Sequence, residues 1–197
     1  VARADSKIKT VKDIKGKKVS LGAPGGGDQV LTRMILKAAG IDPEKDLQAA
    51  QLTQPEGAMA LTDGNIDAVF WNFAAPGASV MEVEATRKVK LIPLPEEVVQ
   101  KVVEDNPFLL PFNFKPGIYR SVDKDVLTIA DGNYMVVRAD MDEELAYNLL
   151  KTFIEKRDEF MDVTPQAANF IPDLASKGII PFHPGAIKYF KEKGIDM

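Results

Sequence analysis

Apolar positions in the first half of the chain form short runs that alternate with stretches of helical spacing. Runs typical of strands occupy residues 19–21, 47–52, 66–71 and 89–94. Helical spacing, with proline or glycine near the ends, predicts helices over residues 29–39, 55–61, 76–87 and 95–104. Strand and helix therefore alternate between about residues 12 and 105, which predicts an α/β layer with a mostly parallel sheet.

The pattern changes in the second half of the chain. Residues 106–117 are rich in proline and phenylalanine and are expected to form a loop, whereas residues 126–129 and 134–137 are expected to form strands. Helices are expected over residues 142–160, 165–177 and 184–193. The change from alternating elements to two strands followed by helices indicates a second body.

The segment Lys18–Val30, KVSLGAPGGGDQV, is the strongest candidate for binding chemistry. A short apolar strand runs directly into a glycine-rich loop, where Gly25, Gly26 and Gly27 allow the backbone to turn sharply and to approach a ligand closely. Asp28 follows as the predicted N-cap of the next helix. Free N–H groups at a helix start favour an anion or a polar group, so the loop is a candidate ligand site.

Three interpretations of this loop are open: a nucleotide-binding loop, a structural turn and a site for a small solute. A P-loop needs Gly-Lys-Ser/Thr after its glycines, whereas Asp28 and Gln29 follow here. Asp46 lies near the position of the acidic residue of a dinucleotide fingerprint, but it precedes its strand instead of ending it. The sequence therefore favours the small-solute site, with the structural turn as the alternative.

Composition narrows the classes of partner. The 197 residues include 25 basic and 29 acidic side chains, with a net charge of −4 and no basic patch, so nucleic acid is not an expected partner. No apolar run reaches the length of a membrane span. The sequence has no cysteine and a single histidine, His183, which we interpret as a structural turn residue. We therefore expect no metal site and no cofactor.

Several segments resemble a known family of solute receptors. Thr10–Val19, TVKDIKGKKV, looks like the entry into the second lobe of type II periplasmic binding proteins, and Asp63–Phe70, DGNIDAVF, resembles one of their strands. Thr128, Tyr147 and above all His183–Phe190, HPGAIKYF, match the TAXI group, whose members are solute receptors of tripartite TRAP transporters. The order and spacing of these segments over nearly the whole chain make the resemblance fairly specific.

The resemblance implies two α/β lobes joined by hinge strands, with the ligand in the cleft between them. Residues 1–11 would then end lobe one and form the first hinge, residues 12–115 would form lobe two, and residues 116–197 would form the second hinge and the C-terminal part of lobe one. Lobe one would be incomplete, because the family carries an N-terminal portion, with a signal peptide, ahead of the position of Val1. An incomplete lobe would leave an open sheet edge, which invites self-association.

The implied function is that of an extracytoplasmic, periplasmic receptor subunit and not that of an enzyme. Such a receptor captures a small organic solute, a carboxylate or an amino acid, by closure of its lobes, and then docks on the membrane permease subunits of a TRAP transporter. An enzyme or a ligand-sensing regulatory domain with the same fold is the alternative, and a surface protein that has lost transport is a third. The sequence contains no Gly-x-Ser-x-Gly elbow and no cysteine nucleophile.

The glycine loop departs from the family pattern. Gly26 and Asp28 stand where the family usually carries Ser and Thr, so hydroxyls that would help to bind a carboxylate are replaced by a carboxylate side chain. Asp28 is interpreted as a helix cap, with an ammonium group of the solute as the alternative partner. Ala74-Ala75 also replaces a glycine-rich turn, which narrows the space for backbone approach before Pro76.

Four further residues are candidates for contact with the solute. Trp71, Asn72 and Phe73 end the run at residues 66–71, at the sheet edge where α/β proteins bind ligands. Trp71 is expected either as an apolar wall of the site or as core, and Asn72 as a hydrogen-bonding group. Tyr119 lies near the second expected hinge, where its hydroxyl could reach the solute or the ring could pack internally. The complete predicted ligand set is Gly25, Gly26, Gly27, Asp28, Trp71, Asn72, Phe73 and Tyr119.

Overall fold

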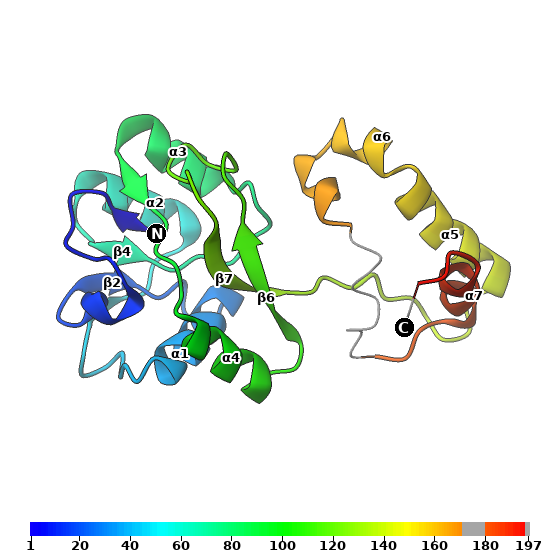
Figure 1. Ribbon diagram of the computed structural model, residues 1–197, viewed down its shortest axis with the longest axis horizontal. Coiled ribbons are helices and arrows are strands. Elements are labelled where there is room, and N and C mark those ends of the chain that lie inside the picture. The colour runs from blue at the N-terminus through cyan, green and yellow to red at the C-terminus, as the bar shows by residue number, and fades with distance from the viewer. Residues whose placement is uncertain (171–179, 196–197) are drawn as a thin grey trace. The chain divides into compact units, whose positions relative to one another are not determined.

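The computed structural model describes residues 1–170 and 180–195 (Figure 1). The chain divides into two compact units, Val1–Asp131 and Gly132–Met197. The first unit contains a five-stranded sheet in the order β3-β2-β4-β1-β5. Its strands are β1 (Ala2–Arg3), β2 (Lys18–Ser20), β3 (Gln48–Ala50), β4 (Ala68–Val69) and β5 (Val89–Lys90).

The direction of these strands confirms the predicted α/β class. β2 pairs in parallel with β3 and β4, whereas β1 is antiparallel to both β4 and β5. β5 therefore runs in the same direction as β4, and β1 is the strand that opposes the others. The sheet is mostly parallel, as the alternating apolar pattern predicts.

Helices cover both faces of this sheet (Figure 1). Val19 and Ala68 pack on one face with the apolar sides of α1 and α4, while Val69 packs on the other face with α2 and α3. This arrangement follows from the alternation of side chains along a strand, which sends neighbouring residues to opposite faces. The helical elements of the unit are η1 (Val11–Ile14), α1 (Gly27–Ala38), α2 (Gln54–Asp63), α3 (Ala78–Thr86) and α4 (Glu96–Asp105).

A two-stranded antiparallel sheet completes the first unit. It consists of β6 (Leu109–Phe114) and β7 (Val126–Asp131), with Pro111 opposite Ile129 in the register. The expectation of a loop over residues 106–117 is therefore wrong. Pro111 is tolerated because each strand of a two-stranded sheet keeps one free edge, where the missing N–H is not needed.

The second unit consists of helices α5 (Glu143–Glu155), α6 (Arg157–Met161), η2 (Pro165–Asn169) and α7 (Pro184–Glu192). The strand expected over residues 134–137 is not formed, and the side chains of this segment are exposed. The single helix expected over residues 142–160 is divided at Lys156 into α5 and α6. Of the helix expected over residues 165–177, the first part is the 3-10 turn η2, and residues 171–177 lie outside the described residues.

The start of α7 shows why His183 is structural. Its Nδ1 accepts a hydrogen bond from the Gly185 N–H at 3.2 Å and caps the helix, while its Nε2 lies 3.1 Å from the Met141 carbonyl oxygen. A side chain at Gly185 would place its Cβ 2.3 Å from the Glu143 carbonyl oxygen, so glycine allows α7 to pack directly on the start of α5. This confirms the interpretation of His183 as a turn residue.

Candidate functional site

The glycine loop between β2 and α1 is shaped by one close approach. Gly22 has φ +99°, and a Cβ at this position would lie 2.5 Å from the Asp28 Cβ and 2.9 Å from the Gln29 nitrogen. Only glycine allows the loop to fold back against the first turn of α1 here. Gly25 also has a positive φ of +71°, but a Cβ there would meet no atom within 4 Å. Gly22 therefore allows close packing against α1, whereas Gly25 allows the backbone to turn.

The side chain of Asp28 does not cap α1, and that interpretation is wrong. The N-cap is Gly26, the helix begins at Gly27, and Asp28 is its second residue. The Asp28 Oδ1 accepts a hydrogen bond from the Asn72 N–H at 3.2 Å, and Oδ2 accepts one from the Gln54 Nε2 at 3.3 Å. Gln54 Nε2 also donates to the Asn72 carbonyl oxygen at 3.3 Å. Asp28 thus ties the start of α1 to the start of α2 and to the backbone beyond β4.

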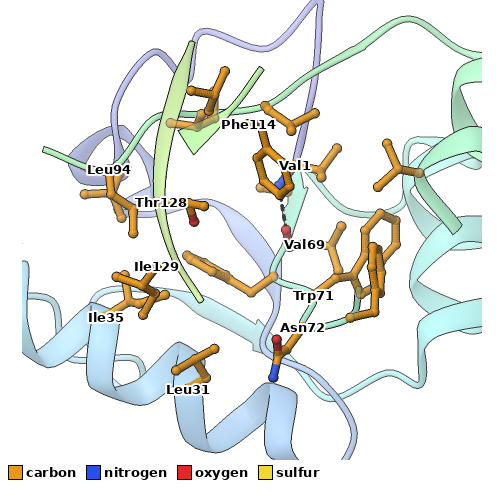
Figure 2. Close-up of a pocket in the computed structure, with 18 of the residues that line it drawn as sticks. Val1, Leu31, Ile35, Val69, Trp71, Asn72, Leu94, Phe114, Thr128 and Ile129 are labelled. Atoms are coloured by element: carbon orange, nitrogen blue, oxygen red, sulfur yellow. Dashed lines mark hydrogen bonds between the residues drawn. The ribbon is translucent and has the colours of Figure 1, made fainter. Parts of the chain in front are cut away.

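A cavity of about 140 Å³ lies in the first unit (Figure 2). Trp71, Asn72 and Phe73, which follow β4, form part of its wall. Further lining comes from the side chains of α1, of β6 and β7, and of the segment after β5. The residues concerned include Leu31 and Ile35 from α1, Phe114, Thr128 and Ile129 from the two-stranded sheet, and Leu91 and Leu94 from the segment after β5.

Tyr119 also lines the cavity, and its hydroxyl is already engaged. The Gly77 N–H donates to the Tyr119 hydroxyl oxygen at 2.7 Å. Burial raises the pKa of Tyr119, so the phenol stays protonated at neutral pH. Gly77 contacts the Phe73 ring so closely that an added Cβ would lie 1.8 Å from a ring carbon. Gly77 therefore holds two wall residues, Phe73 and Tyr119, in place.

Most of the side chains that line the cavity are apolar. Asn72, Tyr119, Thr128 and the indole N–H of Trp71 supply the polar side-chain groups, and no lining side chain is charged. The Trp71 Nε1 is buried and has no hydrogen-bond partner among the described residues. The Asn72 Nδ2 donates to the Asp131 Oδ2 at 3.3 Å. The Val1 nitrogen donates to the Val69 carbonyl oxygen at 2.8 Å, and burial lowers the pKa of this amino group to about 5.

The predicted ligand set falls into two groups in the structure. Trp71, Asn72, Phe73 and Tyr119 lie together around the cavity, whereas Gly25, Gly26, Gly27 and Asp28 are not among its lining residues. Asp28 is nevertheless joined to Asn72 by a hydrogen bond. Contact between a ligand and any residue of the predicted set stays a prediction.

Sequence reasoning missed the wall residues of α1 and of the two-stranded sheet. Leu31 and Ile35 fit a helical face and read as ordinary core positions. Phe114 lies in a segment that is expected to be a loop, so no signal places it in the wall of the cavity. Thr128 is one of the residues that carry the family resemblance, and this is the signal that could identify it.

Residues 1–170 and 180–195 contain neither a metal cluster nor a membrane-spanning helix. No group of three or more His, Asp or Glu side chains in these ranges could hold a metal ion. No helix in the same ranges is long and apolar enough to cross a membrane. The cavity is therefore the candidate functional site of the described residues.

Comparison with known proteins gives a family and two similar structures. The model of the NMT1-like family matches residues 1–194. The crystal structure of the periplasmic aliphatic sulphonate binding protein SsuA from Escherichia coli is 34% identical over 36% of this chain and 22% of its own length, with a TM-score of 0.33. A structure from Methylobacillus flagellatus KT is 15% identical, covers 97% of this chain and 55% of its own length, and has a TM-score of 0.47. It is described as the periplasmic sulfonate-binding protein SsuA of a sulfonate ABC transporter. The chain thus spans 22% and 55% of the lengths of these two structures.

Proposed function

We propose that this chain, which belongs to the NMT1-like family, acts in an extracytoplasmic solute receptor that binds a small organic solute and releases it unchanged. The observation that carries the proposal is the cavity beyond the carboxyl end of β4, where the wall residue Asn72 is hydrogen-bonded to Asp28, the residue after the glycine loop. Ligands of open α/β sheets bind at this edge of the sheet. An apolar cavity with a few polar groups is the usual form of a small-molecule site.

The chemistry of the lining supports binding over catalysis. The Tyr119 hydroxyl is held by Gly77 and stays protonated, and the Asn72 amide is not an acid or a base. The Thr128 hydroxyl has no carboxylate or imidazole among the lining residues to act as its base. An enzyme or a ligand-sensing domain with the same fold is the competing function, and product analysis separates it from a receptor.

The finer assignment is a TAXI-type receptor that works with TRAP permease subunits in the periplasm. It is supported by the resemblance of Thr10–Val19 and His183–Phe190 to that group. The similar SsuA structures name sulfonate binding instead, and one names an ABC transporter. Uptake of solute into reconstituted vesicles distinguishes a TRAP transporter from an ABC transporter, because an ion gradient drives a TRAP transporter and ATP hydrolysis drives an ABC transporter.

The proposed solute is an amino acid or another small carboxylate, captured by closure of two lobes. The proposed lobe boundaries remain residues 1–11, 12–115 and 116–197, and association with a second copy is part of the proposal.

Binding is tested by titrating the 197-residue chain with amino acids and carboxylates while following the fluorescence of Trp71, its single tryptophan. A receptor gives a saturable change and returns the solute chemically intact. A flat response to every solute at millimolar concentration refutes the proposal.

A further inference from the structure

We propose that the cavity of the first unit receives the apolar end of the solute, an aromatic or branched aliphatic group of about six carbon atoms, and that the site rejects an anionic group beside Asn72. This inference rests on the proposed function, because it specifies which part of the solute the receptor recognises. Among the proposed solutes it favours an amino acid with an apolar side chain and with its ammonium group beside Asn72 over a simple carboxylate.

The walls of the cavity favour an apolar group. Leu31 and Ile35 of α1 lie on one side, with Ile129 of β7 close by, while Phe114 and Trp71 line other parts of the wall (Figure 2). Leu31, Ile35, Ile129 and Phe114 offer water no hydrogen-bonding side-chain group, so water against this part of the wall lacks partners. A ligand group that replaces it removes its own apolar surface from water, which is favourable in proportion to the area buried.

The volume of the cavity sets the size of that group. At about 140 Å³ it is close to the apolar cavity of about 150 Å³ that binds benzene in another protein. A phenyl ring or a branched alkyl group therefore fits without rearrangement of the walls. A larger ring system would have to extend through the open side of the cavity or displace packed side chains, and displacement is unfavourable in a close-packed interior.

The charges around Asn72 determine the other end of the solute. The Asn72 N–H donates to the Asp28 carboxylate, and its side-chain amide donates to the Asp131 carboxylate. A carboxylate or sulfonate placed here would meet two negative charges and no lysine or arginine among the lining residues. The Val1 amino group also lines the cavity, but it is uncharged at neutral pH because burial lowers its pKa to about 5. A neutral group or an ammonium group is therefore favoured at this position.

Three probes that share one ring test this inference: toluene, benzylamine and benzoate. They are titrated into the 197-residue chain, with Trp71 fluorescence and thermal unfolding as readouts. We expect toluene and benzylamine to bind, and benzoate to bind at least roughly tenfold more weakly because of the carboxylates near Asn72. The inference is overturned if none of the three binds or if benzoate binds most tightly.

A matched pair of variants locates the binding. Leu31→Phe adds a ring from α1 into the cavity, whereas Val30→Phe adds the same ring at a neighbouring position that is 53% exposed. We expect toluene affinity to fall at least roughly tenfold in the first variant and to stay unchanged in the second. Ile35→Phe fills the same space and serves if Leu31→Phe does not fold. Equal affinity in the filled variants and in the unmodified chain overturns the inference.

The outcomes also separate this inference from the proposed function. If the chain binds the ring probes in the cavity but retains no solute of its own, the receptor proposal fails and the cavity assignment stands. If it retains a solute that lacks an apolar group, the receptor proposal stands and the cavity assignment fails.

Discussion

Gly77→Ala is expected to disrupt the wall of the cavity by a direct clash. The new Cβ would lie 1.8, 2.3 and 2.6 Å from three carbon atoms of the Phe73 ring. These separations are far below van der Waals contact, so the ring must leave its place. The same shift strains the hydrogen bond that the Gly77 N–H donates to Tyr119.

The size of the effect follows from two terms. Overpacking of this kind usually costs about 1–3 kcal/mol, and loss of a glycine N-cap in favour of alanine adds about 1 kcal/mol. Gly77 is the N-cap of α3, so both terms apply. We expect the free energy of unfolding to fall by about 3 kcal/mol. Gly57→Ala is the control: its nearest contacts, with Trp71 and Val69, are an ordinary 3.4 Å, and removal of a glycine from inside α2 should stabilise by about 0.5–1 kcal/mol.

The assay is urea unfolding followed by Trp71 fluorescence and circular dichroism, repeated in a Phe73→Ala background. Removal of the ring removes the clash but leaves the cap term unchanged. Gly77→Ala should therefore cost only about 1 kcal/mol in that background, which gives a coupling of about 2 kcal/mol between the two positions. An equal cost in both backgrounds would show that the close approach to Phe73 is not the cause.

Three further predictions test the loop and the buried amino group. Asp28→Ala should lower the free energy of unfolding by about 2 kcal/mol in the same urea assay, because the Asn72 N–H loses its acceptor. Asp28→Asn keeps an acceptor oxygen and should lower the free energy of unfolding by less than about 1 kcal/mol. Gly22→Ala should lower the free energy of unfolding by about 3 kcal/mol, because φ is +99° and the new Cβ would lie 2.5 Å from the Asp28 Cβ. Gly25→Ala should lower it by only about 1 kcal/mol, because a Cβ at Gly25 meets no atom within 4 Å. Similar losses in the two variants would contradict the packing role of Gly22. Burial lowers the pKa of the Val1 amino group from 8.0 to about 5, so the unfolded chain binds more protons between these values, and stability should rise from pH 5 to pH 8 by about 3 kcal/mol. Acetylation of Val1 should abolish this rise, and a rise of the same size in the acetylated chain would refute the assignment.

The core of the first unit could be predicted from the sequence because its signals are local. Val19, Val69 and Val89 lie in short apolar runs, and the helices between them begin and end with recognisable residues. Such patterns indicate that one face of a strand or helix is buried, and burial of that face is the main condition for these strands and helices to form.

The two-stranded sheet could not be predicted because its stability depends on pairing. Pro111 argues against a strand in isolation, yet β6 forms because β7 supplies a partner and leaves one edge free. Conversely, residues 134–137 have strong strand propensity but show no strand pairing with any other described residue. Strand propensity reflects packing against neighbours more than an intrinsic backbone preference.

Of the cavity wall, only Tyr119 and the residues that follow β4 could be predicted from the sequence. Trp71 and Asn72 could be placed near the site because they follow a strand of the parallel sheet. The role of Asp28 depends on Gln54 and Asn72, which lie 26 and 44 residues further along the chain. A contact over such separations leaves no periodic signal, so the local preference for an N-cap gave the wrong interpretation.

The central claim is that the cavity holds a solute, and a gentle native mass spectrum tests it most directly. The chain of 21.6 kDa and its Leu31→Phe and Val30→Phe variants would be purified from the same host and measured side by side. We expect added mass on the unmodified chain and on Val30→Phe that is lost on denaturation, and the mass of the bare chain for Leu31→Phe. Bare mass for all three chains, or the same added mass on all three, would contradict it.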